Sequence, residues 1–314
     1  MKVCMIGLGS IGRRHIHNLA EQLKRWNIEF QIDALRSGKK KLSDELESMI
    51  CTQYYQISDM PEDYDIVFVT NPTSLHYDTI QKVIGKTKHI FIEKPVFESS
   101  QYDIKAIPLK KDGVYYVACP LRHKSIMKYI KREVIEREKI VAARIISTSY
   151  LPSWREEVDY RSVYSARESL GGGVTRDLIH EWDYAVYLFG MPDRVLHMKG
   201  HMSRLEIDSD DVSIYIARYS DMLLEMHLDY IGHKTERILQ LYTDDRRIDV
   251  DFISDTICEY VNNELVGKKK FESEDCYKKE MEYFLSCIEK KQDNMNTISN
   301  AYQILRIAMT EELG

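Results

Sequence analysis

Apolar residues in the first part of the chain form short continuous runs, and these alternate with stretches where apolar positions recur at helical spacing. A short continuous apolar run is typical of a strand that is buried on both faces, as in a parallel sheet. Strands that alternate with helices predict an α/β fold built on a doubly wound parallel sheet. The runs that we predict as strands are 3–6, 30–37, 65–70, 89–92 and 115–119.

The pattern changes from Ile140 onward, where the segments become longer and richer in β-forming residues. Several of them alternate apolar and polar side chains, as 212–217 does, which is typical of an antiparallel sheet with one wetter face. We therefore predict a parallel-sheet domain over 1–121 and an α+β domain over 122–314. The strands predicted in the second domain are 140–150, 211–219, 223–230, 237–242, 247–252 and 256–261.

Composition and charge narrow the class of protein. The chain has 314 residues, of which 44% are hydrophobic and 30% charged, as in a soluble globular protein. Its net charge of −6 argues against a broad surface for nucleic acid or membrane. No apolar run is long enough to span a bilayer, and the N-terminus leads directly into a strand, so we expect a cytoplasmic protein. The 6 cysteines are scattered, so we expect neither disulfides nor a metal site.

The first predicted strand ends in a glycine motif that opens a helix. In Gly7-Leu-Gly9-Ser10-Ile11-Gly12, Gly7 would make a tight turn, Gly9 would let the backbone approach a pyrophosphate, and Gly12 would let helix and strand pack closely. The N-terminus of the helix offers free N–H groups to the anion. Glycines also serve ordinary turns, but the strand before and the helix after favour a dinucleotide site.

The second predicted strand ends in Arg36 and Ser37, where NAD-binding folds carry an acidic residue that binds the ribose hydroxyls. A guanidinium and a hydroxyl would instead bind a 2′-phosphate, at about 1.5–3 kcal/mol for each charged hydrogen bond. These two residues therefore predict NADP as the preferred cofactor, with NAD also possible. The alternative is a solvated basic turn, which we favour for the three lysines at 39–41.

Polar residues follow the later parallel strands, and ligands of open α/β sheets bind at the carboxyl ends of the strands. These residues are Thr70, Asn71, Glu93, Lys94 and Arg122. Burial would lower the pKa of a lysine amine toward the range where it exchanges protons, so Lys94 is a candidate catalytic residue. The alternative role for Lys94 is an ion pair with Glu93 or a hydrogen bond to a cofactor hydroxyl.

Aromatic residues and arginines alternate between the first long strand of the second domain and a later triple glycine. Such a segment suits a polar ring that stacks on an aromatic face while charged groups fix its hydroxyls or phosphate. The alternative is a loop with aromatic anchors and solvated arginines. The residues that we predict to bind substrate here are Trp154, Arg155, Tyr160, Arg161 and Tyr164.

The glycine run at 171–173 predicts a helix that continues to Phe189. On one continuous helix, Asp177, His180, Glu181 and Tyr184 would project from a common face. A carboxylate and an imidazole on one face can form an acid–base pair. By spacing alone, an ordinary exposed polar face is the more frequent outcome.

Taken together, these motifs resemble the glucose–fructose oxidoreductase and inositol dehydrogenase family (Gfo/Idh/MocA). The resemblance rests on the glycine motif, Thr70-Asn-Pro-Thr-Ser-Leu-His76, Glu93-Lys94-Pro95, and Gly171-Gly-Gly-Val-x-x-Asp177 with His180. It implies an N-terminal Rossmann domain, a C-terminal domain with a large open sheet that commonly joins subunits, and hydride transfer between NAD(P) and a sugar or cyclitol hydroxyl.

The resemblance also implies roles for individual residues. Lys94, Asp177 and His180 become the catalytic candidates, while Glu181 and Arg122 join the substrate candidates. Because most family members place the histidine four residues after the aspartate and this chain places it three after, either Asp177 or Glu181 could partner His180. The residues implied to bind the cofactor are Gly7, Gly9, Ser10, Ile11, Gly12, Arg36, Ser37, Thr70, Asn71, Pro72, His76, Glu93 and Lys94.

The leading hypothesis is an NADP-preferring oxidoreductase that acts on a sugar, a sugar derivative or a nucleotide-linked sugar, as a homodimer or homotetramer. The segment from Tyr160 to Arg167 resembles sequences of bacterial surface-polysaccharide enzymes. One alternative is a glycosidase of the same fold that retains NAD. The other is a non-catalytic NADP-binding regulator, which would not need Lys94, Asp177 and His180.

Overall fold

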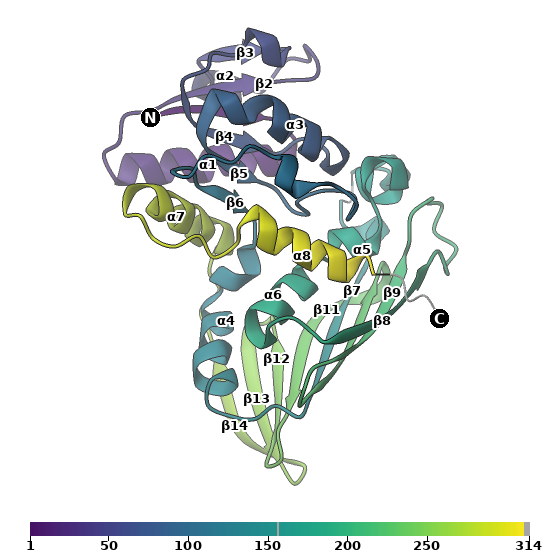
Figure 1. The fold of residues 1–314 in the computed structure, drawn as a ribbon. Coiled ribbons are helices and arrows are strands. Elements are labelled where there is room, and N and C mark those ends of the chain that lie inside the picture. The colour runs from purple at the N-terminus through teal and green to yellow at the C-terminus, as the bar shows by residue number, and fades with distance from the viewer. Residues whose placement is uncertain (156, 311–314) are drawn as a thin grey trace. The chain divides into compact units, whose positions relative to one another are not determined.

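The computed structural model describes residues 1–155 and 157–310, which fold into two compact units (Figure 1). The first unit combines Met1–Pro120 with Cys276–Leu305. The second combines Leu121–Asp275 with the end of the chain from Arg306. The boundary near residue 121 is close to the one expected, but Cys276–Leu305 is placed in the first unit, whereas the sequence assigned it to the second domain.

The first unit contains a six-stranded sheet in the order β3-β2-β1-β4-β5-β6, and all neighbouring strands are parallel. The predicted doubly wound parallel sheet is thereby confirmed. The strands are β1 (Lys2–Ile6), β2 (Gln31–Leu35), β3 (Thr52–Tyr54), β4 (Tyr64–Val69), β5 (Thr87–Ile92) and β6 (Tyr115–Val117). β3 was missed because its three residues are only partly buried or exposed and so form no apolar run.

Helices from both ends of the chain complete this unit. They are α1 (Ser10–Arg25), α2 (Asp44–Met49), α3 (His76–Val83), α7 (Cys276–Glu289) and, as far as Leu305, α8 (Ile298–Ala308). α7 packs beside α1, and Lys278 and Arg25 form ion pairs across the two helices with Glu21 and Glu282. Phe284 of α7 reaches the rings of the sheet core, with its centroid 5.2 Å from that of Phe91. The apolar stripe of α7 therefore belongs to the core of the parallel sheet.

The second unit contains an eight-stranded sheet in the order β14-β13-β12-β11-β7-β10-β9-β8. All neighbouring strands are antiparallel except β7 and β10, which confirms the mostly antiparallel sheet. The strands are β7 (Ala142–Tyr150), β8 (Arg194–Gly200), β9 (Val212–Arg218), β10 (Leu223–Asp229), β11 (Ile231–Tyr242), β12 (Arg247–Asp251), β13 (Thr256–Val261) and β14 (Glu264–Lys270). β8 and β14 were not predicted.

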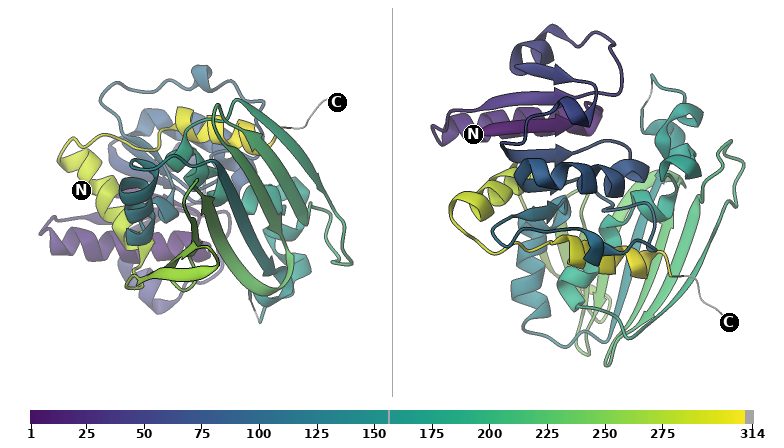
Figure 2. Two further views of the ribbon diagram at one scale, coloured as in Figure 1. Left: turned by 90° about the horizontal axis from the view of Figure 1, so that it is seen from below. Right: turned by 45° about the horizontal axis from the view of Figure 1, so that its top comes forward.

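The alternation in β9 marks the two faces of this sheet. Ser213, Tyr215 and Ala217 are buried, whereas Ile214, Ile216 and Arg218 are exposed. Figures 1 and 2 show α6 (His180–Phe189) against one face of the sheet, and Trp182 of α6 meets Tyr215 edge-on at 5.2 Å between centroids. The helix α4 (Ser125–Ile130) also belongs to this unit, where it is followed by a π-helical turn at Lys131–Ile135.

The helix predicted after the triple glycine is interrupted. α5 (Val174–Asp177) ends at Leu178, whose φ of −95° and ψ of 27° leave the helical region, and α6 starts at His180. The entry into α5 is fixed by Gly173, with φ of +110°, where a Cβ would lie 2.3 Å from Asp210 Oδ1. Because of the interruption, Asp177 and His180 do not lie on a common helix face, and that prediction is wrong.

No helix among the described residues is both long and apolar enough to cross a membrane.

Candidate functional site

The loop after β1 has the geometry that a dinucleotide requires. Gly7 has φ of +94°, and a Cβ there would lie 2.8 Å from the backbone nitrogen of Asn71. A Cβ on Gly12 would lie 2.3 Å from the carbonyl oxygen of Gly7 and 2.8 Å from Thr70 Oγ1. A Cβ on Gly9, in contrast, would meet nothing within 4 Å. A crowded turn, a closely packed helix and an open middle glycine fit a pyrophosphate above the loop.

The N-terminus of α1 adds to this fit. Gly9 is its N-cap residue and provides no side-chain hydrogen bond, and no acidic residue lies in the first turn. Ser10 is exposed and Ile11 partly exposed where this 16-residue helix begins. The first N–H groups of a helix and its dipole favour an anion at this position.

The residues after β4 mainly hold the loops in place. Thr70 Oγ1 donates to the carbonyl oxygens of Ile6 and Gly7, at 3.0 and 2.7 Å. His76 is completely buried, with Nε2 3.0 Å from the carbonyl oxygen of Asn71 and Nδ1 3.2 Å from that of Pro95. Burial lowers the pKa of His76 despite these contacts. We therefore interpret His76 as a positioning residue for the loops after β4 and β5.

Asn71 and Pro72 lie closer to the surface than His76. The amide nitrogen of Asn71 donates to Thr79 Oγ1 at 2.9 Å, while its Oδ1 has no hydrogen-bond donor in the part of the chain that the structure describes. Pro72 is exposed and precedes a short 3-10 turn at Thr73–Leu75. The free amide oxygen offers an acceptor beside the glycine loop.

Glu93 and Lys94 follow β5 at the same carboxyl edge of the sheet as the glycine loop. Glu93 is buried, with Oε1 2.5 Å from His15 Nε2, and its other oxygen accepts the backbone N–H of Lys94 at 3.0 Å. Burial would raise the pKa of Glu93, but His15 and the Lys94 charge and N–H outweigh it, so the pKa is lowered. Glu93 therefore acts as an internal anion that fixes the backbone of Lys94. The Lys94–Pro95 peptide bond is cis, and Lys94 itself is partly exposed.

Arg36 lies directly after β2, as predicted. Its Nη1 donates to Gln53 Oε1 at 2.6 Å, and its Nη2 donates to the carbonyl oxygen of Lys40. These contacts fix the guanidinium at the end of the strand, and Ser37 beside it is exposed. The arrangement leaves a positive charge and a hydroxyl where an acidic residue would bind a ribose.

In the second unit, Asp177 is the centre of a buried hydrogen-bond cluster. Tyr164 Oη donates to Asp177 Oδ1 and Tyr230 Oη donates to Oδ2, both at 2.6 Å. Burial, followed by the charge of Asp177, raises the pKa of Tyr230 well above its ordinary value, so Tyr230 remains a donor. His180, the first residue of α6, is partly exposed.

Glu181 and Arg122 were predicted to bind substrate, and the structure places both inside the protein. Glu181 has no exposed surface and accepts from Arg237 Nε at 2.8 Å. Arg122 donates from Nε and Nη2 to the two oxygens of Asp183, at 2.9 and 2.7 Å. These ion pairs attach the first turn of α6 to β11 and to the segment before α4. Contact of these two residues with substrate stays a prediction.

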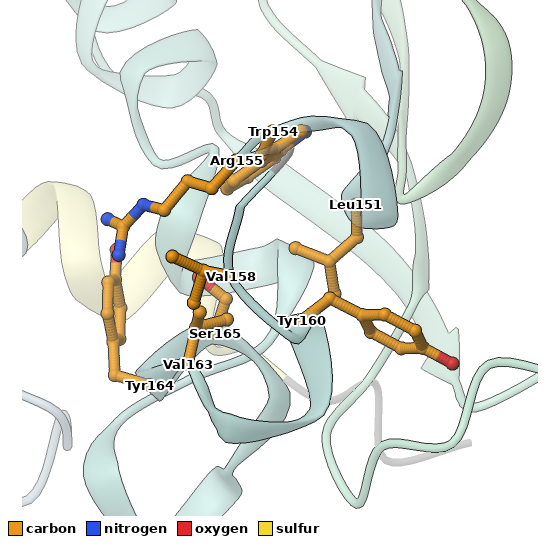
Figure 3. Close-up of a pocket in the computed structure, with 8 residues that line it drawn as sticks. All are labelled: Leu151, Trp154, Arg155, Val158, Tyr160, Val163, Tyr164 and Ser165. Carbon is orange, nitrogen blue, oxygen red and sulfur yellow. The ribbon is translucent and has the colours of Figure 1, made fainter.

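A pocket does form in the aromatic and arginine-rich segment (Figure 3). Four of the five residues predicted to bind substrate here line it, namely Trp154, Arg155, Tyr160 and Tyr164, whereas Arg161 forms ion pairs with Asp159 and Glu206. The complete lining is Leu151, Trp154, Arg155, Val158, Tyr160, Val163, Tyr164 and Ser165. The side chains of this segment thus enclose a concave surface.

Three residues that hydrogen-bond to candidate site residues were not predicted from the sequence. His15 supports Glu93, Tyr230 supports Asp177, and Arg237 supports Glu181. Each lies more than 50 residues from its partner in the chain, at 78, 53 and 56 positions. No local pattern could have identified these pairs.

Comparison with known proteins agrees with the geometry of the glycine loop. Residues 1–109 match the model of the oxidoreductase family with an NAD-binding Rossmann fold, Gfo/Idh/MocA. The first 109 residues of the chain are therefore similar to this family. The resemblance that the motifs predicted is therefore confirmed, together with the NAD-binding Rossmann fold of the first unit.

Individual relatives extend the comparison. Uncharacterized oxidoreductase YrbE of Bacillus subtilis is 28% identical over 199 residues, which are 62% of this chain and 56% of that protein. Myo-inositol 2-dehydrogenase of Thermotoga maritima is 27% identical over 198 residues, 60% of this chain and 55% of the relative. The chain thus spans about half the length of the curated relatives it matches.

A solved structure of levoglucosan dehydrogenase in complex with NADH and levoglucosan superposes over 98% of this chain and 95% of its own, with a TM-score of 0.81. Its sequence identity of 17% shows a common fold and no more. The agreement over nearly the whole chain confirms the predicted fold class, a Rossmann unit and a unit with a large, mostly antiparallel sheet.

Proposed function

We propose that this protein is an NAD(P)-dependent oxidoreductase that interconverts a hydroxyl and a keto group on a sugar or sugar derivative. The observation that carries the proposal is the glycine loop, where Gly7 and Gly12 are crowded and Gly9 is open. Lys94 supports it, because it lies at the carboxyl edge of the same parallel sheet. A relative named as a myo-inositol 2-dehydrogenase favours a polyhydroxylated substrate.

The nicotinamide, when bound, supplies the hydride acceptor or donor. The chain's own residues must then bind the reacting oxygen and move its proton. We assign proton transfer to His180 and polarisation of the oxygen to Lys94. Glu181 is committed to Arg237 inside the protein, so Asp177 is the carboxylate that we retain in the site. Held by Tyr164 and Tyr230, it would orient the residues around His180.

The proposal is tested by mixing the protein with NADP or NAD and a panel of cyclitols, hexoses, anhydrosugars and nucleotide sugars, and following reduced nicotinamide at its absorbance band. Turnover with one of these substrates is expected. A dinucleotide that stays bound through purification and is reduced only transiently would indicate the glycosidase instead. Binding of a dinucleotide without turnover on the whole panel would favour the regulator. A role in surface-polysaccharide synthesis remains a prediction.

NADP is expected to bind more tightly than NAD. Arg36 is held by Gln53 and the Lys40 carbonyl at the end of β2, where its charge would attract a 2′-phosphate. Arg36→Asp should weaken NADP binding at least about tenfold, as loss of one charged hydrogen bond predicts, and should spare or improve NAD binding. Calorimetry measures both affinities, with Lys41→Asp in the neighbouring basic turn as the control. Tighter binding of NAD by the wild type would contradict the assignment.

A homo-oligomer is expected to form through the outer face of the eight-stranded sheet. Met198, Ile214 and Ile216 are 80%, 41% and 45% exposed there, and Met198 pairs directly with Ile214 between β8 and β9. Neighbouring exposed apolar side chains of this kind mark a contact surface. Analytical ultracentrifugation should detect a dimer or tetramer that Ile214→Lys with Ile216→Lys dissociates, while Ile253→Lys in an exposed turn does not. A wild-type monomer at micromolar concentration would count against the prediction.

A further inference from the structure

The arginines of the pocket segment differ in how their charges are compensated. Arg161 pairs with Asp159 and Glu206, and Arg167 lies 3.5 Å from Asp208. Arg155 lines the pocket, but its guanidinium has no ion pair or hydrogen bond with any residue in 1–155 or 157–310. Figure 3 shows its side chain extending toward the hydroxyl end of Tyr164. Within the described part of the chain, the positive charge of Arg155 in this pocket therefore has no acidic partner.

The aromatic walls of the pocket are held in fixed positions. The indole nitrogen of Trp154 donates to Ser149 Oγ at 2.9 Å, and the ring meets Tyr230 edge-on at 5.3 Å between centroids. Tyr164 donates its hydroxyl proton to Asp177 Oδ1 at 2.6 Å, which holds its ring in place. Both rings are partly exposed, Trp154 at 40% and Tyr164 at 37%. Such preorganisation lowers the cost of ordering the site when a ligand binds.

We propose that this pocket binds the anionic group of an acidic sugar, a carboxylate or a phosphate ester, through Arg155. Trp154 would pack against the apolar face of the sugar ring. The assignment rests on the proposed function, because it names the substrate class of that site. Binding of an anion requires a complementary positive charge, which the guanidinium of Arg155 supplies. Its planar shape also allows two parallel hydrogen bonds to a carboxylate or a phosphate.

A guanidinium binds a carboxylate and a phosphate by the same chemistry. Two anionic sugars therefore serve as probes, to show which of the two groups the pocket binds. D-glucuronate carries a carboxylate on the ring, α-D-glucose 1-phosphate carries a phosphate ester, and D-glucose carries neither. Because the pocket lies within the second unit, binding can be measured on the full chain without dinucleotide. The readout is the NMR signal of the Trp154 indole N–H, which Trp154→Phe identifies.

At least one of the two anionic sugars should shift this signal saturably, with a dissociation constant at least tenfold below that of D-glucose. Arg155→Gln should abolish the preference for the anion, and Arg167→Gln, which removes a paired arginine of the same segment, should retain it. Whichever anion binds more tightly identifies the substrate's acidic group. Equal binding of D-glucose and both anions, or an anion preference that survives Arg155→Gln, would overturn the proposal.

The failure of this subsite and the failure of the proposed function give different results. If Arg155-dependent anion binding is found but no sugar reduces the dinucleotide, the oxidoreductase proposal fails and the subsite stands. If a neutral sugar is turned over and Arg155→Gln has wild-type kcat and KM, the subsite fails and the oxidoreductase proposal stands.

Discussion

His180→Ala is expected to lower kcat by at least about 100-fold, the lower bound for loss of a positioned acid–base group, and to leave NADP affinity nearly unchanged. Oxidation of a secondary alcohol removes the O–H proton as the C–H hydride departs, so a base must contact that oxygen. Histidine side chains ordinarily titrate near pH 6.5, which suits proton exchange at neutral pH. Steady-state kinetics on the true substrate, with calorimetry for NADP, measures both quantities.

His17→Ala is the matched control, because His17 is a half-exposed histidine on α1 that lies 3.8 Å from Glu45. It should leave kcat and substrate KM unchanged. If His180→Ala turns over at the wild-type rate, His180 has no part in proton transfer. Lys94 in the first unit or Tyr164 in the second would then be the base, and the Tyr164 hydroxyl already contacts Asp177.

Local patterns predicted the parts of the site that local backbone geometry determines. The glycine motif is the clearest case, since the turn at Gly7 and the close approach at Gly12 involve residues within the motif and at the end of one adjacent strand. The position of Arg36 after β2 followed in the same way from the end of a strand. Parallel topology was predicted because buried strands read as continuous apolar runs.

The roles of charged residues were harder to predict than backbone geometry, because these roles depend on ion-pair partners far away in the sequence. Glu181 and Arg122 have the chemistry of substrate ligands, and nothing near them in the sequence indicates that Arg237 and Asp183 neutralise them. Burial of an unpaired charge is so costly that a buried carboxylate implies a partner, but the sequence does not name that partner.

The interrupted helix after the triple glycine shows a second limit. The apolar stripe through Trp182 and Phe189 has helical spacing, and the sequence extends it back to the glycines without a helix-breaking residue. In the structure, Leu178 leaves the helical region, and Asp177 binds Tyr164 and Tyr230. Tertiary hydrogen bonds thus override a local helical preference at the position where the candidate carboxylate lies.

Lys94→Ala is expected to lower kcat at least about 100-fold and, unlike His180→Ala, to weaken dinucleotide binding as well. Lys94 lies at the carboxyl edge of the parallel sheet that carries the glycine loop, where open α/β sheets bind their ligands. Its backbone N–H donates to the buried Glu93, and Glu93 is held in turn by His15. The backbone from which the Lys94 side chain extends is therefore fixed. The readouts are kcat on the true substrate and the dissociation constant for NADP.

Lys88→Ala tests whether the loss is specific, because Lys88 belongs to the same strand but pairs at the surface with Asp65, at 3.3 Å. This control should keep wild-type kcat and NADP affinity. Glu93→Gln separates the two functions of the loop: it keeps a side chain of similar size but weakens the contacts with His15 and the Lys94 N–H, so it should reduce kcat through misplacement of an intact amine. A Lys94→Ala protein that binds NADP normally and retains kcat would show that the amine touches neither the cofactor nor the reacting oxygen.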